Sequence, residues 1–165
     1  MRIGILTVSD RASSGDYEDQ SGPLIVAIIQ RRTNWVVVHS AIVADETDDI
    51  VAVLEQWCSN GLNLIFTTGG TGFGPRDVTP EATLMVIDRE APGIAEALRA
   101  ESLKITRHAM LSRARSGIRG QTLIINLPGS PKAVKESLDI LLPVLPHALD
   151  LLNAGDDSEK GHRTV

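Results

Sequence analysis

The sequence has one cysteine, few aromatic residues (3%) and no excess of basic side chains. Cys58 alone cannot form an intrachain disulfide or a cysteine-based zinc site. Because no base lies near it in the sequence, an inert, half-buried thiol is favoured over a nucleophile. The net charge of −5 argues against general nucleic-acid binding, which requires a basic surface. No apolar run approaches the roughly 20 residues of a membrane-spanning helix. We therefore expect a soluble protein of a reducing compartment, the cytoplasm, without nucleic-acid or membrane partners.

Because aromatic residues are few, aliphatic side chains must fill the core of this 165-residue chain. The hydrophobic pattern predicts strands over 2–9, 35–43, 64–66 and 121–127, which alternate with helices. The helices are expected over 24–32, 47–60, 81–88 and 92–106, with a further helical turn over 108–112. A long helix over 133–152 should be kinked or restarted by Pro143 and Pro146. This alternation predicts an α/β fold with a mainly parallel sheet, formed by one domain over 1–152 and followed by a polar tail over 153–165.

A glycine-rich segment follows the strand predicted over 64–66. Residues 67–72 have the sequence Thr-Thr-Gly-Gly-Thr-Gly, and Arg76 and Asp77 come directly after it. Thr79 and Pro80 are typical of an N-cap and a first helical residue. Glycines let a ligand approach the main chain, and successive N–H groups can hold an anion. A turn without a ligand is the alternative. The spacing matches neither a Walker loop nor a dinucleotide fingerprint, so it indicates a phosphate or another anion without identifying it.

Other predicted strands also end in polar residues. The segment 9–15 carries Asp10 and Arg11, Asp45 follows the strand over 35–43, and Asn126 lies at the end of the strand over 121–127. Open α/β sheets place ligands at the carboxyl ends of their strands. A solvated loop remains the alternative for 9–15, and a helix-capping role remains the alternative for Asp45. If the strands are parallel, Asp45 and Asp77 project from the same edge of the sheet.

Basic residues are concentrated over 111–120, with Arg113, Arg115 and Arg119. In an acidic protein this segment predicts a second anion site, and a solvated basic face is the equal alternative. A further helix start follows the last strand, with Ser130 as the expected N-cap and Lys132 in the first turn. His39, on an alternating strand position, is expected to be an edge histidine or a hydrogen-bonded one rather than a ligand.

Four of these segments together resemble one family. They are residues 67–80, residues 9–15, Ser112 with Arg113, and residues 127–131. The family is that of the molybdopterin adenylyltransferases of molybdenum-cofactor biosynthesis, whose relatives include the G domain of gephyrin. The resemblance runs from Arg2 to about Leu152. It implies a three-layer, Rossmann-like α/β domain with a mainly parallel central sheet, of the type found in molybdenum-cofactor biosynthesis proteins.

The resemblance also implies an activity. Family members use Mg-ATP to transfer AMP to the terminal phosphate of molybdopterin, with release of pyrophosphate, and they are usually homotrimers. A partner enzyme then inserts molybdate into the product. The two essential aspartates of the family correspond to Asp45 and Asp77. Together with the strand-end residues, the resemblance predicts a substrate site made of Ser9, Asp10, Arg11, Ser13, Ser14, Thr68, Gly69, Gly70, Thr71, Gly72, Arg76, Ser112, Arg113, Asn126, Pro128, Gly129, Ser130 and Lys132.

The implied chemistry makes physical demands that these residues can meet. A phosphate nucleophile is ionised at neutral pH, so positioning and charge neutralisation should carry catalysis. Two aspartates beside two anionic substrates would be repulsive, so we predict that Asp45 and Asp77 hold Mg²⁺, directly or through water. Arg76, Arg113 and Lys132 are candidates for neutralising phosphates. A scaffold domain and a nucleotide switch are the rival functions. A scaffold would not need both aspartates and the glycine loop, and the lysine of a nucleotide switch motif is missing.

Overall fold

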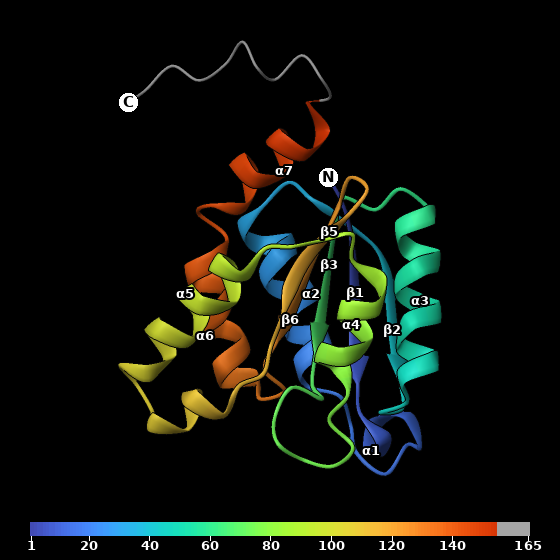
Figure 1. Ribbon diagram of the computed structural model, residues 1–165, viewed down its shortest axis with the longest axis vertical. Coiled ribbons are helices and arrows are strands. Elements are labelled where there is room, and N and C mark those ends of the chain that lie inside the picture. The colour runs from blue at the N-terminus through green and yellow to red at the C-terminus, as the bar shows by residue number, and fades with distance from the viewer. Residues whose placement is uncertain (155–165) are drawn as a thin grey trace.

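The computed structural model describes residues 1–154. A six-stranded sheet in the order β2-β1-β3-β6-β5-β4 forms its centre (Figure 1). β2, β1, β3 and β6 are parallel, whereas β5 is antiparallel to β6 and β4 is antiparallel to β5. The strands are β1 (Arg2–Val8), β2 (Val36–Val43), β3 (Leu64–Thr68), β4 (Arg89–Glu90), β5 (Ser116–Arg119) and β6 (Thr122–Leu127).

Helices cover both faces of the sheet. α3 and α4 pack on one face with β1 side chains such as Leu6 and Val8, and α2, α5, α6 and α7 pack on the other with Ile3 and Ile5. Successive β1 residues thus enter opposite cores, as the period of two requires of a strand buried on both faces. The helices are α1 (Asp10–Ser13), α2 (Ser21–Arg32), α3 (Thr47–Ser59), α4 (Thr79–Val86), α5 (Pro92–Leu103), the 3₁₀ helix η1 (Arg107–Leu111), α6 (Pro131–Leu141) and α7 (Leu145–Asn153). The predicted three-layer α/β fold is confirmed.

The last two helices follow the proline prediction. α6 ends at Leu141 and α7 begins at Leu145, so the chain restarts its helix between Pro143 and Pro146. Asn153, assigned to the polar tail, is the last residue of α7, and residues 155–165 of that tail lie outside the described residues. No helix in the described part of the chain is long and apolar enough to cross a membrane.

Three local predictions were wrong. The segment after β1 is a short helix over Asp10–Ser13 rather than a loop, because the Ser9 side chain accepts a hydrogen bond from the backbone N–H of Ala12 at 3.2 Å. Thr79 is the first residue of α4 rather than its N-cap, and its buried hydroxyl donates to the Gly69 carbonyl instead. The strands β4 and β5 were not predicted, because two residues show no period and β5 contains a glycine, which is depleted in strands.

Two further predictions concern positions in the sheet: His39 was expected at an edge, and the polar segments after the parallel strands were expected at one end. β2 is an edge strand, and its residue His39 stacks on Trp57 with ring centroids 5.5 Å apart, which agrees with a packed edge histidine. α1 and the loop after β3 lie at one end of the sheet, at the bottom of Figure 1, where the parallel strands end. The β5–β6 turn lies at the opposite end.

Candidate active site

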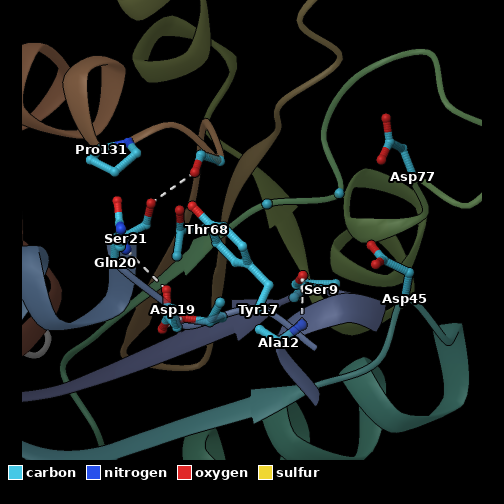
Figure 2. Close-up of a pocket in the computed structure, with 15 residues that line it drawn as sticks. Ser9, Ala12, Tyr17, Asp19, Gln20, Ser21, Asp45, Thr68, Asp77 and Pro131 are labelled. Atoms are coloured by element: carbon cyan, nitrogen blue, oxygen red, sulfur yellow. Dashed lines mark hydrogen bonds between the residues drawn. The ribbon is translucent and has the colours of Figure 1, made fainter. Parts of the chain in front are cut away.

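A cavity of about 260 Å³ lies at the carboxyl ends of the parallel strands (Figure 2). Asp45, from the loop after β2, and Asp77, from the loop after β3, both line it. Figure 2 shows the two carboxylates on the same side of the cavity, with Asp19 and Ser21 on the other. The structure therefore brings together the two aspartates that the sequence places 32 positions apart (77 − 45). Five more of the predicted residues contribute to this wall: Ser9, Thr68, Gly69, Gly70 and Gly129.

Glycine is required where the loop after β3 turns into the cavity. Gly69 has φ +97°, and a Cβ on it would lie 2.2 Å from the carbonyl oxygen of Val8. Gly70 has φ +62°, and a Cβ there would lie 2.4 Å from the Thr79 hydroxyl oxygen and 2.9 Å from a carboxylate oxygen of Asp45. L-residues adopt these φ values only at a cost, and no side chain fits the space. The close approach of β1, α4 and Asp45 therefore depends on two glycines in sequence.

Asp45 is held by a reciprocal pair of hydrogen bonds with Asp10. The Asp10 N–H donates to the Asp45 carboxylate at 2.8 Å, and the Asp45 N–H donates to the Asp10 carboxylate at 3.0 Å. Burial is the main cause that raises the pKa of the Asp45 carboxyl group, and the negative charges of Asp10 and Asp77 raise it further. A bound cation would relieve this excess of negative charge. Asp45 is therefore fixed in position by the backbone and electrostatically suited to a cation.

Arg76 pairs with acids rather than facing the cavity. Its guanidinium donates to both carboxylate oxygens of Asp10 at 3.0 Å and to Glu46 at 2.7 Å. These hydrogen bonds lower the pKa of Asp10 and raise that of Arg76. The side chain of Arg76 is 54% exposed, so water screens each of these pairs and weakens its contribution to stability. Arg76 thus links the loops after β1, β2 and β3.

The Asp77 side chain contacts backbone of the loop to which it belongs. Its carboxylate accepts a hydrogen bond from the Gly74 N–H at 2.9 Å, and a Cβ on Gly72 would lie 2.9 Å from the same carboxylate. The orientation of the Asp77 side chain therefore depends on the conformation of residues 72–77.

Arg113, a candidate for neutralising phosphates, has three partners within the protein. Its guanidinium donates to the Gly72 carbonyl at 2.6 Å, to the Asp77 carbonyl and to the Glu81 carboxylate. The other arginines of the basic segment are paired as well, Arg115 with Glu90 and Arg119 with Glu55. Acidic partners brought from α3, α4 and β4 explain why a segment that looks basic in the sequence is largely neutralised in the fold.

A second cavity, of about 290 Å³, lies between α5, η1, α6 and the glycine loop, and it is mostly apolar. Five predicted residues line it: Thr71, Gly72, Ser112, Asn126 and Pro128. The buried Asn126 side chain is already committed, because its amide donates to the hydroxyls of Thr67 and Thr83 and its carbonyl accepts from the Arg115 N–H. Its polar atoms therefore order the core beside the cavity.

Eight of the predicted residues line neither cavity: Asp10, Arg11, Ser13, Ser14, Arg76, Arg113, Ser130 and Lys132. Ser13 and Ser14 donate to the carbonyls of Asp10 and Arg11, and Ser130 caps α6 by accepting from the Ala133 N–H. Lys132 is 80% exposed, with its Nζ 3.9 Å from Glu136. These contacts are local, and in the structure they shape the strand-end loops.

A second group of cavity residues lies at the start of α2 and was not predicted from the sequence. The Asp19 carboxylate accepts from the hydroxyl of Thr7 at 2.6 Å and from the N–H groups of Ser21 and Gly22. The Ser21 hydroxyl donates to the Gly129 carbonyl at 2.7 Å. An acid just before a Ser-Gly-Pro run is a helix-start signal. This signal would have placed the start of α2 at Ser21 instead of residue 24. Ser21 lines the cavity.

The carboxylates of Asp45 and Asp77 can hold a magnesium ion only if other ligands contribute. Among residues 1–154, no group of three or more His, Cys, Asp or Glu side chains is arranged to hold a metal. Asp45 and Asp77 supply hard carboxylate oxygens, which Mg²⁺ prefers, and this ion commonly keeps several waters and binds substrate phosphates. Two carboxylates beside one cavity therefore fit a Mg²⁺ ion that is shared with a phosphorylated substrate.

Comparisons with known proteins agree on one family. The family described as a probable molybdopterin binding domain matches residues 4–147. The chain is 46% identical over 154 residues to a molybdopterin adenylyltransferase of Helicobacter pylori, covering 92% of this chain and 88% of that protein. It is 47% identical to Dictyostelium discoideum gephyrin over 98% of this chain but only 24% of gephyrin, so it spans about a quarter of that relative's length. The structure of the molybdopterin biosynthesis enzyme MoaB from Thermus thermophilus superposes with a TM-score of 0.87 at 49% identity, covering 93% of this chain and 96% of that one.

Proposed function

The chain belongs to the family of probable molybdopterin binding domains, and we propose that it is a molybdopterin adenylyltransferase of molybdenum-cofactor biosynthesis. Relatives that carry this name share 43–46% identity with it over most of its length. In the proposed reaction, an oxygen of the terminal phosphate of molybdopterin attacks the α-phosphorus of ATP. The bond from that phosphorus to the bridging oxygen breaks, and pyrophosphate leaves with the electron pair. The products are adenylylated molybdopterin and pyrophosphate.

One observation carries this proposal: Asp45 and Asp77 line the same cavity beside Gly69 and Gly70. The glycine turn lets a phosphate approach the main chain. Asp45 and Asp77 would hold Mg²⁺, which would supply charge neutralisation between the two anionic substrates. The reciprocal hydrogen bonds with Asp10 orient Asp45, and the Gly74 N–H orients Asp77. Positioning of this kind is the main contribution a protein makes to phosphoryl and nucleotidyl transfer.

Transfer of a labelled α-phosphate from ATP to molybdopterin tests the proposed function. The purified protein is incubated with molybdopterin, Mg²⁺ and ATP labelled in the α-phosphate, and the label is followed into molybdopterin. We expect labelled product with the wild type. Asp77→Ala should lose transfer by at least about 100-fold, because a ligand of the Mg²⁺ that would neutralise the reacting phosphates is gone, while its melting temperature stays near that of the wild type. Full turnover of Asp77→Ala at saturating Mg-ATP would remove this residue from the mechanism.

We also propose the assembly and the setting that the family resemblance implies: a cytoplasmic homotrimer that passes its product to a molybdate-inserting enzyme. Large apolar side chains at the surface support an assembly, since Phe73 is 69% exposed and Met85 is 64% exposed. A contact between protomers would remove such side chains from water. Sedimentation equilibrium of the purified protein tests the trimer, and a monomeric mass at micromolar concentration would contradict it.

A further inference from the structure

The guanidinium of Arg113 joins the two ends of one loop. Its Nε–H donates to the Gly72 carbonyl at 2.6 Å and an Nη2–H donates to the Asp77 carbonyl at 2.5 Å. An Nη1–H donates to the Glu81 carboxylate, in the first turn of α4. The backbone of Arg113 joins this arrangement, because its N–H donates to the Thr71 carbonyl at 2.9 Å. One residue from the segment before β5 therefore closes residues 72–77 onto the start of α4.

This loop determines where the Asp77 carboxylate points. The Gly74 N–H donates to that carboxylate at 2.9 Å, and the Gly74 carbonyl accepts from the Asp77 N–H at 3.0 Å. A Cβ on Gly72 or Gly74 would lie 2.9 or 3.0 Å from a carboxylate oxygen of Asp77, so the side chain is folded back over both glycines. Opening the loop between Gly72 and Asp77 would break this arrangement.

From these contacts we infer that Arg113 is a positioning residue, which braces the glycine loop so that Asp77 is presented to the cavity. It does not act as a ligand of a substrate phosphate. The inference rests on the proposed function for its catalytic consequence, while the bracing itself does not. Three of the five guanidinium N–H groups are used within the protein. Arg113 lines neither of the two cavities described above, whereas Asp77 lines the first. Arg113 and Asp77 share a separate, open hollow with Phe73 and Glu81, where the guanidinium is already engaged by Glu81.

The geometry of these contacts requires arginine and would not be reproduced by lysine. A planar fork reaches three acceptors in different directions, whereas a lysine ammonium is a point charge with a different reach. A phosphate ligand, by contrast, would be largely replaced by lysine, since lysine also binds phosphate. Glu81 separates the two roles further. In a brace, its loss weakens the loop, but beside a phosphate ligand its loss would leave the arginine more available.

The experiment compares Arg113→Met, Arg113→Lys and Glu81→Gln with a matched control, Arg115→Met. Arg115 lies two positions away on the same segment and pairs with Glu90 at 3.3 Å, and its side chain makes none of the loop contacts. Hydrogen exchange is measured on the protein without substrates. We expect the amides of Gly74, Asp77 and Thr79 to exchange at least about tenfold faster in both Arg113 variants, because each loses hydrogen bonds to the loop carbonyls. Glu81→Gln keeps an acceptor oxygen but loses the charge of a half-exposed pair, so exchange there should rise by about two- to fivefold. All three amides should be unchanged in Arg115→Met.

Kinetics of AMP transfer supply the second readout. We expect kcat to fall about 10- to 100-fold in both Arg113 variants, as for a misplaced catalytic group, with little change in the KM for ATP. Glu81→Gln should change in the same direction, and Arg115→Met should match the wild type. If Arg113→Lys keeps wild-type exchange and kcat, or if Glu81→Gln is no less active than the wild type, the inference is overturned.

The outcomes also separate this inference from the proposed function. Absence of AMP transfer in the wild type would defeat the proposed function, and hydrogen exchange alone would then decide whether Arg113 braces the loop. If the Arg113 variants do not fold, Glu81→Gln decides, because it leaves the arginine and its contacts with the two carbonyls in place. Wild-type exchange at Gly74 and Asp77 in Glu81→Gln would then overturn the inference.

Discussion

Substitution of Gly70 by alanine should damage both stability and activity. Gly70 has φ +62°, and a Cβ there would lie 2.4 Å from the Thr79 hydroxyl oxygen and 2.9 Å from a carboxylate oxygen of Asp45. An L-residue pays about 1–2 kcal/mol for this backbone region, of which about 0.4–1 kcal/mol is recovered through the lower entropy of the unfolded chain. The net backbone cost is about 1 kcal/mol by these figures.

The displaced side chains add to this cost. The buried Thr79 hydroxyl donates to the Gly69 carbonyl at 2.9 Å, and moving it leaves buried polar groups without partners, at about 1–3 kcal/mol. Gly70→Ala should therefore lose about 3 kcal/mol of unfolding free energy, which lowers Tm by about 6–12 °C in a domain of this size. Because the new methyl group also pushes on the Asp45 carboxylate, AMP transfer should fall about 100-fold.

Gly120→Ala is the matched control. Gly120 has φ +55°, but no atom lies within 4 Å of the position that a Cβ would take, and the residue belongs to the β5–β6 turn at the end of the sheet opposite the cavity. We expect only the backbone cost, a Tm lower by about 2–4 °C, and unchanged transfer. Calorimetry and the α-phosphate label assay measure both quantities. Equal Tm and equal activity in the two variants would refute the steric reasoning for Gly70.

Three further predictions concern other groups. Asp45→Asn should raise the Mg²⁺ concentration needed for half-maximal transfer, because a neutral amide attracts the ion less than a carboxylate does; an unchanged metal titration would count against ligation by Asp45. Burial raises the pKa of the Cys58 thiol, so a disulfide reagent at pH 8 should modify it more slowly in the folded protein than in urea, and Cys58→Ser should keep full transfer. Hydrogen bonds from Arg32 and Lys135 hold the pKa of Asp139 below its usual value. The stability that this carboxylate contributes is therefore present above about pH 4 and is lost as the pH falls through the lowered pKa. Asp139→Asn should cost less than about 1 kcal/mol at pH 7, and chemical denaturation that shows a larger loss would contradict this assignment.

Much of the fold follows from local patterns. Continuous apolar runs predicted β1, β3 and β6, a run of β-branched residues predicted β2, and helix-start signals predicted the beginnings of α5 and α6. Where the signal was short or mixed, the prediction failed: β4 has two residues, and β5 carries Ser116 and Gly117 before its single aliphatic residue. These strands exist because they pair with β6 and with each other, and that pairing depends on residues far along the chain.

The sequence by itself determined the fold class and the glycine loop, and its resemblance to a known family singled out Asp45 and Asp77 as candidates. These depend on residue type and on neighbours within a few positions. Only the tertiary structure decided what each charged group faces. Asp45 meets Asp10 across 35 positions, and Arg113 meets Gly72 across 41. A guanidinium that looks available for phosphate in the sequence is satisfied in the fold by carbonyls and carboxylates from other elements. The physical reason is that the partner of a charge is set by how strands and helices pack, and this information is not local in the chain.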